Sequence, residues 1–147
     1  MKSLFDKAAY QEITSRLDRL TPSSQAQWGK MNVAQMLAHC AVPIGHQLGR
    51  HQVPKEGNFL VRLLFKSLLY NDKPFRRSLP TAKSFVIVDS REFQQEHDRL
   101  KSMVVEAHKL GLGHDWPEHP SFGKFTPQQA GQAMYKHLDH HLTQFGV

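Results

Sequence analysis

Four long segments of the chain carry apolar residues at three- and four-residue spacing, the pattern of an amphipathic helix. The segments are residues 4–20, Asn32 to about Leu48 or Gly49, Asp89 or Ser90 to Leu110, and Thr126 to Gln144 or Phe145. A Thr-Pro-Ser-Ser run ends the first segment, and a glycine follows the third and the fourth. We therefore expect four long helices, each with one buried face.

Three of these segments begin with the residues of a capping box, a polar N-cap followed three positions later by Gln or Glu. The pairs are Asn32 with Gln35, Asp89 with Glu92, and Thr126 with Gln129. Pro127 occupies the first helical position after Thr126, where proline is well tolerated. We expect Pro43 to kink the second helix, because proline cannot donate a backbone hydrogen bond.

Residues 50–91 have a less regular pattern. Their apolar stretch Phe59–Tyr70 predicts a further helix. Residues 84–88 have strand-like composition but no obvious partner strand, so we expect an extended loop that covers a helical core. Four long helices and one irregular crossover between the second and the third predict an all-α four-helix bundle, with residues 1–147 forming one domain.

Composition limits the class of protein further. The chain has one Cys, which excludes an internal disulfide framework and a Cys-rich zinc module and is typical of a reducing compartment. The first residues carry no apolar signal sequence. The stretch Phe59–Tyr70 is interrupted by Arg62 and Lys66 and is too short to cross a bilayer. We expect a soluble cytoplasmic protein without a membrane partner.

The formal net charge of +6 does not indicate a nucleic-acid partner. The basic residues are scattered over several segments, and none of the usual nucleic-acid-binding motifs is present. Lys73, Arg76 and Arg77 form a small basic cluster, which is either a solvated loop or a group that attracts an anionic substrate.

The chain has 10 His, and two of them share the apolar face of the last helix. At about 100° per residue, His137 and His141 fall in one stripe with Ala130, Met134, Leu138 and Phe145, whereas His140 lies outside it. Two imidazoles at i and i+4 can reach one metal ion. The alternative is that each imidazole is buried with a hydrogen bond to a neighbouring helix.

A metal site would need at least one further ligand from elsewhere in the chain. The other histidines that could supply it are His39, His46, His97, His108, His114 and His119. Periodicity alone does not choose between His39 and His46, which share one face of the second helix.

The residues around these histidines resemble the DinB/YfiT-like superfamily. The segment from Trp28 to His39 resembles the opening of that superfamily's second helix, and residues 119–126 and 137–146 are similar to an uncharacterised branch of it. Lys73-Pro74-Phe75 and Pro80-Thr81 in the crossover resemble the same branch, so the likeness extends over nearly the whole chain.

The resemblance implies a four-helix bundle with a three-histidine metal site, carried over here onto His39, His137 and His141. Three protein ligands leave a position open for water, thiol or substrate. Ligand type leaves zinc, nickel, iron and cobalt open, and we favour zinc or nickel. Better-known relatives are metal-dependent transferases or isomerases that use low-molecular-weight thiols. The resemblance therefore implies a transferase or hydrolase acting on a small molecule, as a homodimer.

Trp28, Asn32 and Gln35 are candidate substrate-binding residues beside this site. Packing for Trp28, and helix capping for Asn32 and Gln35, are equally good explanations. We find no clear general base, because Asp139 is expected to face away, and Cys40 lies on an apolar stripe as a core residue. The competing function is a metal-free ligand-binding or dimerising bundle in which the histidines are structural.

Overall fold

The computed structural model describes residues 1–55 and 59–147, and within these ranges the chain is helical and contains no β-strand. The α-helices are α1 (Lys7–Leu17), α2 (Val33–Gln47), α3 (Phe59–Phe65), α4 (Phe93–Leu110) and α5 (Pro127–Gln144). Short 3-10 helices are η1 (Lys66–Leu69), η2 (Lys83–Phe85) and η3 (Gly111–Gly113). The prediction of an all-α fold is confirmed.

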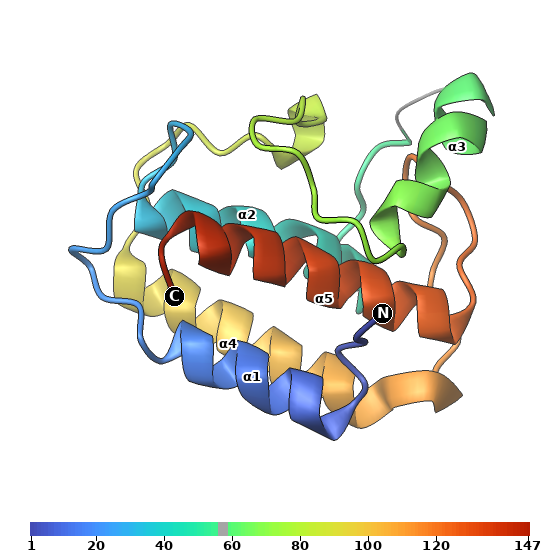
Figure 1. Ribbon diagram of the computed structural model, residues 1–147, viewed down its shortest axis with the longest axis horizontal. Coiled ribbons are helices and arrows are strands. Elements are labelled where there is room, and N and C mark those ends of the chain that lie inside the picture. The colour runs from blue at the N-terminus through green and yellow to red at the C-terminus, as the bar shows by residue number, and fades with distance from the viewer. Residues whose placement is uncertain (56–58) are drawn as a thin grey trace.

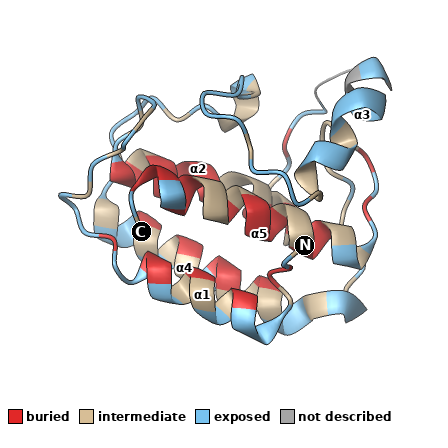
Figure 2. Ribbon diagram, viewed as in Figure 1, coloured by how far each residue is buried: buried red, intermediate tan, exposed pale blue. Residues whose placement is uncertain are grey.

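The four longer helices lie side by side around one core. α2 packs against α4 and α5, and α1 packs against the same two helices from the other side (Figure 1). The inward faces of these helices are buried and their outward faces are exposed (Figure 2). The largest fully buried apolar side chains are Leu4, Ile13, Leu17, Met36, Leu37, Ile44, Leu100, Val104, Leu138 and Leu142.

The helix starts of α2 and α5 agree with the sequence prediction. The Asn32 side chain accepts a hydrogen bond from the Gln35 backbone, and the Gln35 side chain accepts one from the Asn32 backbone. Thr126 and Gln129 form the same reciprocal pair at the start of α5, with Pro127 as its first residue. Both boxes satisfy backbone donors that the first helical turn leaves unpaired. α2 continues through Pro43 to Gln47.

The predicted limits of the first helix were too wide. α1 begins at Lys7, after Asp6, whose extended backbone makes it the N-cap, and Leu4 before it donates its backbone N–H to the Gly131 carbonyl of α5. At the other end the helix stops at Leu17, although Leu20 is still buried. The apolar spacing therefore identified the buried side chains correctly, while the backbone at both ends follows other hydrogen bonds.

The predicted start of the third long helix at Asp89 or Ser90 was wrong. α4 begins at Phe93, and the carboxylate of Glu92 caps it by accepting from the Gln95 backbone N–H. Asp89 pairs with Arg91 instead. Both acids carry a suitable capping group, so the residue types alone could not separate a cap at Asp89 from one at Glu92.

The crossover contains a short helix whose apolar face points outward. The predicted helix over Phe59–Tyr70 divides into α3 and η1, and α3 stands off from the four longer helices (Figure 1). Lys66, just after α3, donates to the Lys124 carbonyl, while Leu60, Leu63 and Leu64 are exposed. The basic side of this segment thus faces the protein, and leucines face the solvent.

Residues 83–88, which we call the strap, begin with η2 and lie against α2. The strap contains no strand, and this agrees with the expectation of a loop covering the helical core. Within the described ranges, none of the helices has both the length and the apolar character that crossing a bilayer requires.

The core and α3 should respond differently to the same substitution. We expect Leu100→Ala, at a fully buried position of α4, to lower the free energy of unfolding by about 2–5 kcal/mol, because it removes buried methyl groups and leaves a cavity. Leu64→Ala, at a position that is 64% exposed, should change it by less than about 0.5 kcal/mol. Urea unfolding of the two variants measures the difference, and equal losses would contradict this picture of α3.

Candidate metal centre

Three histidine side chains from α2 and α5 meet between these two helices. α5 places His137 and His141 one turn apart, and α2 presents His39 to both. The centroids of the three rings lie 4.9, 4.7 and 4.8 Å apart in the pairs 39–137, 39–141 and 137–141. One ring nitrogen from each residue lies within 4.8 Å of the other two. The structure therefore brings together the three histidines that the resemblance implied.

Two of the rings are held by hydrogen bonds to their Nδ1 atoms. His39 Nδ1 lies 2.8 Å from the carbonyl oxygen of Phe85 in the strap, so this nitrogen carries the proton and donates it. His141 Nδ1 lies 2.8 Å from Gln144 Oε1. Gln144 in turn donates from Nε2 to the Trp28 carbonyl at 2.6 Å, which fixes the amide with its oxygen toward His141. Both rings are left with an unprotonated Nε2.

The third ring has its Nε2 directed at the same place. His137 Nε2 lies 3.0 Å from His39 Nε2. His39 and His141 are buried, and His137 is only partly exposed. The arrangement gathers the imidazole nitrogens of three side chains at one place between α2 and α5.

Burial keeps these imidazoles neutral. It lowers the pKa of His39, and only the hydrogen bond to Phe85 opposes that effect. Burial, with the neighbouring imidazoles as a second cause, holds the pKa of His137 well below its ordinary value and lowers that of His141 to about 3. Because neutral imidazole is the form that binds metal ions, the lowered pKa values of the three rings favour metal binding near neutral pH.

The donor set fits a divalent transition metal. Two imidazole nitrogens bound tetrahedrally to one zinc ion at about 2.0–2.1 Å lie about 3.3 Å apart, a few tenths of an ångström more than the observed 3.0 Å between His39 and His137. Metal-bound histidines usually donate the other ring N–H to a carbonyl or carboxylate, as His39 and His141 do here to a carbonyl and an amide oxygen. The residues present would therefore hold such an ion with the Nδ1 hydrogen bonds of His39 and His141 kept, and the ion would replace the hydrogen bond between His39 Nε2 and His137 Nε2.

The other histidines considered as third ligands lie elsewhere. His46 bonds to the Glu118 carbonyl, His97 to the Leu17 carbonyl and His108 to the Leu4 carbonyl. The ring of His114 lies against Trp116, and His119 accepts from the Ser121 backbone N–H. Each of these side chains has a contact that explains its position without a ligand.

The three candidate substrate-binding residues differ in their positions. Asn32 and Gln35 use their side chains in the capping box, and Gln35 also donates to the Asp89 carbonyl. The Trp28 ring lies 5.8 Å from the ring of His140, which is itself 5.0 Å from His141, and the Arg77 guanidinium stacks on the indole at 4.4 Å. Of the three, only Trp28 has a side chain that takes no part in helix capping and that contacts a neighbour of the cluster, His140.

Two groups beside the cluster were not found from the sequence. Gln144 lies three residues after His141 on the same helix face, a spacing that could have pointed to it. The Phe85 carbonyl carries no sequence signal, because every residue has a backbone oxygen.

Asp139 faces away, as expected, and pairs with Arg16 of α1 at 2.5 Å. Cys40 is fully buried, and burial raises the pKa of its thiol.

Comparison with known proteins places the chain in a family. The family described as "Protein of unknown function (DUF1569)" matches residues 3–146. The chain belongs to the DUF1569 family. This match covers α2 and α5 and all three histidines of the cluster, while the family description names no reaction. No curated protein and no solved structure matches the chain.

Gly29 should be important for the position of Gln144. Its φ is +86°, and a Cβ added there would lie 2.5 Å from Gln144 Nε2. We expect Gly29→Ala to displace the Gln144 amide and to lower the free energy of unfolding by more than Gly49→Ala does. The control residue Gly49 has a φ of +69° with no atom within 4 Å of the added Cβ, so it bears only the backbone cost of about 1–2 kcal/mol. Equal losses in thermal or urea unfolding would refute the contact.

Stability should also depend on pH through His119. Burial, and secondarily His46, lowers its pKa from the ordinary 6.5 to about 4. The unfolded chain therefore takes up a proton at a higher pH than the folded one. The stability contributed by neutral His119 is complete above about pH 6.5 and is lost as the pH falls toward about 4, by up to roughly 1.4 kcal/mol per unit.

His119→Asn replaces Nδ1 by a carbonyl oxygen that can still accept from Ser121 but does not titrate in this range. Urea unfolding between about pH 7 and about pH 4 should show a shallower decline for the variant than for the unmodified protein. Parallel curves would show that His119 is not the titrating group.

Proposed function

We propose that this DUF1569 protein is a metal-dependent enzyme of the DinB-like type, a four-helix bundle in which His39, His137 and His141 hold one divalent ion. The observation that supports the proposal best is the convergence of three neutral imidazoles, two of them oriented through Nδ1. Zinc or nickel is the ion we favour, and both accept an all-nitrogen ligand set, as iron and cobalt also do.

The side chains around the cluster define what the protein would contribute to the chemistry. The Phe85 carbonyl holds the ring of His39, and the Gln144 amide oxygen holds the ring of His141. Both hydrogen bonds keep the proton of the imidazole on Nδ1. Three protein ligands leave at least one coordination position for water, a thiol or the substrate. A metal ion at this place would act as a Lewis acid toward the group that occupies that position.

The reaction that we propose is a transfer or hydrolysis on a small molecule, with a low-molecular-weight thiol as cosubstrate. The thiol and the homodimer are inferred from the DinB-like resemblance alone. Trp28, with Arg77 stacked on its ring, is the residue best placed to meet a substrate that enters beside His140.

Metal binding by an untagged protein tests the proposal. We expect about one zinc or nickel ion per chain by elemental analysis after supplementation and dialysis. His39→Ala, His137→Ala and His141→Ala should each weaken binding by tenfold or more, because each removes one of only three protein ligands. His114→Ala serves as the matched control and should bind like the unmodified protein, because His114 lies against Trp116, outside the cluster.

The competing function is a metal-free bundle with structural histidines. A strong chelator should lower the melting temperature of the metal-loaded protein, since an ion that binds only the folded state stabilises it by mass action. An unchanged melting temperature, together with sub-stoichiometric metal in the unmodified protein and in His114→Ala, would favour the metal-free bundle and defeat the proposal.

A further inference from the structure

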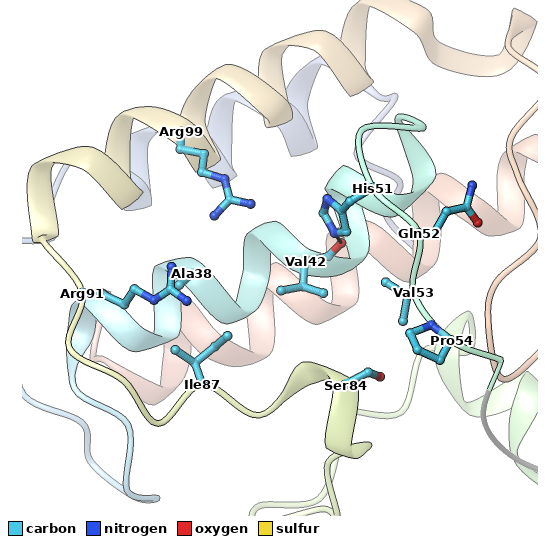
Figure 3. A pocket seen from close by; sticks show the side chains of 10 residues that line it. All are labelled: Ala38, Val42, His51, Gln52, Val53, Pro54, Ser84, Ile87, Arg91 and Arg99. Atoms are coloured by element: carbon cyan, nitrogen blue, oxygen red, sulfur yellow. Dashed lines mark hydrogen bonds between the residues drawn. The ribbon is translucent and has the colours of Figure 1, made fainter.

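A cavity of about 400 Å³ lies on another side of α2, lined by none of the three histidines. Its walls come from α2, the loop after α2, and the strap, and they are completed by Arg91 just before α4 and Arg99 within α4 (Figure 3). Ala38, Val42, Val53 and Ile87 make much of the lining apolar. The volume is in the range of pockets that hold small molecules.

Two arginines supply the positive charge of this cavity. Arg99 extends from α4 toward the space above α2, and Arg91 reaches the cavity from the residues before α4 (Figure 3). Both are tied to one carboxylate, since Arg91 Nη1 lies 3.2 Å from Glu96 Oε1 and Arg99 Nη1 lies 3.1 Å from Glu96 Oε2. Glu96 is only 4% exposed, so a buried acid fixes two guanidinium groups beside the same opening.

The arginines retain donors beyond these ion pairs. Arg91 Nε is buried and has no hydrogen-bond partner among the residues that the structure describes. Arg91 also pairs with Asp89, which is 61% exposed, so that solvent weakens this second interaction. Arg99 uses Nη1 alone on Glu96. A buried N–H without a partner is rare in folded proteins, so the guanidinium of Arg91 is not fully satisfied by its two carboxylates.

We propose that this cavity binds a small organic carboxylate with a compact apolar body. The carboxylate would accept from Arg99 and Arg91, because guanidinium groups match the planar geometry of that group. The apolar body would cover Ala38, Val42 and Ile87. An inorganic anion would leave these apolar walls uncovered, and a neutral ligand would leave the guanidinium donors unmatched. The site needs no metal and is independent of the proposed function.

Benzoate and its uncharged isostere benzamide are suitable probes, and two-dimensional amide NMR of the full chain shows where they bind. We expect saturable shifts at Ala38, Val42 and Ile87 with benzoate, and about tenfold weaker binding of benzamide, since a charged hydrogen bond is lost. Shifts confined to other parts of the chain, or equal affinity for the two probes, would overturn the proposal.

Two variants should change benzoate affinity in opposite directions. Arg99→Gln leaves Glu96 paired with Arg91 and should weaken benzoate binding about tenfold. Glu96→Gln removes the internal acid that competes for both arginines and should tighten binding severalfold, even though it lowers stability. Arg76→Gln, an exposed arginine outside the cavity, is the control and should bind as the unmodified protein does.

A loss of affinity in Glu96→Gln as well as in Arg99→Gln, in variants that are folded, contradicts a carboxylate held by these arginines. Unchanged affinity in both variants contradicts it as well. The spectrum of each variant without probe shows whether it is folded.

Discussion

The contact between α2 and α5 is the constraint on which the candidate site depends. It places a histidine of one helix against two histidines of the other, in a region from which most water is excluded. Imidazoles in such a place must be neutral and must find partners, since an unpaired polar group there is costly. The strap and the end of α5 provide those partners at Nδ1, and the Nε2 atoms are left to face one another. The geometry of the cluster thus follows from the hydrogen bonds that orient the rings of His39 and His141 through Nδ1.

The sequence predicted most where a short local pattern determines the structure. Asn32 with Gln35 and Thr126 with Gln129 located the starts of α2 and α5, because capping involves only neighbouring residues. The helical period placed His137 and His141 on one face for the same reason. The period did not choose His39 over His46, since both lie on one face of α2 and only packing against α5 separates them. The family resemblance, which draws on residues far apart in the chain, was needed there.

The sequence did not predict the structure correctly, or predicted nothing, where contacts between distant or competing residues determine it. Asp89 and Glu92 are both able to cap α4, and the pairing of Asp89 with Arg91 leaves the cap to Glu92. The backbone of Leu4 joins α5 rather than extending α1. The Phe85 carbonyl could not be found from residue types at all. The same strap that offers this carbonyl to His39 also lines the arginine cavity with Ser84 and Ile87, so one short segment borders two polar environments.

The outward leucines of α3 affect the protein through its behaviour in solution rather than through its fold. Their apolar surface is exposed whether the chain is folded or not, so it adds almost nothing to the difference between the two states. The same surface releases about 25 cal/mol for each Å² that another molecule covers. The exposed leucines therefore favour association between molecules. This tendency grows with protein concentration, and a more stable core does not reduce it.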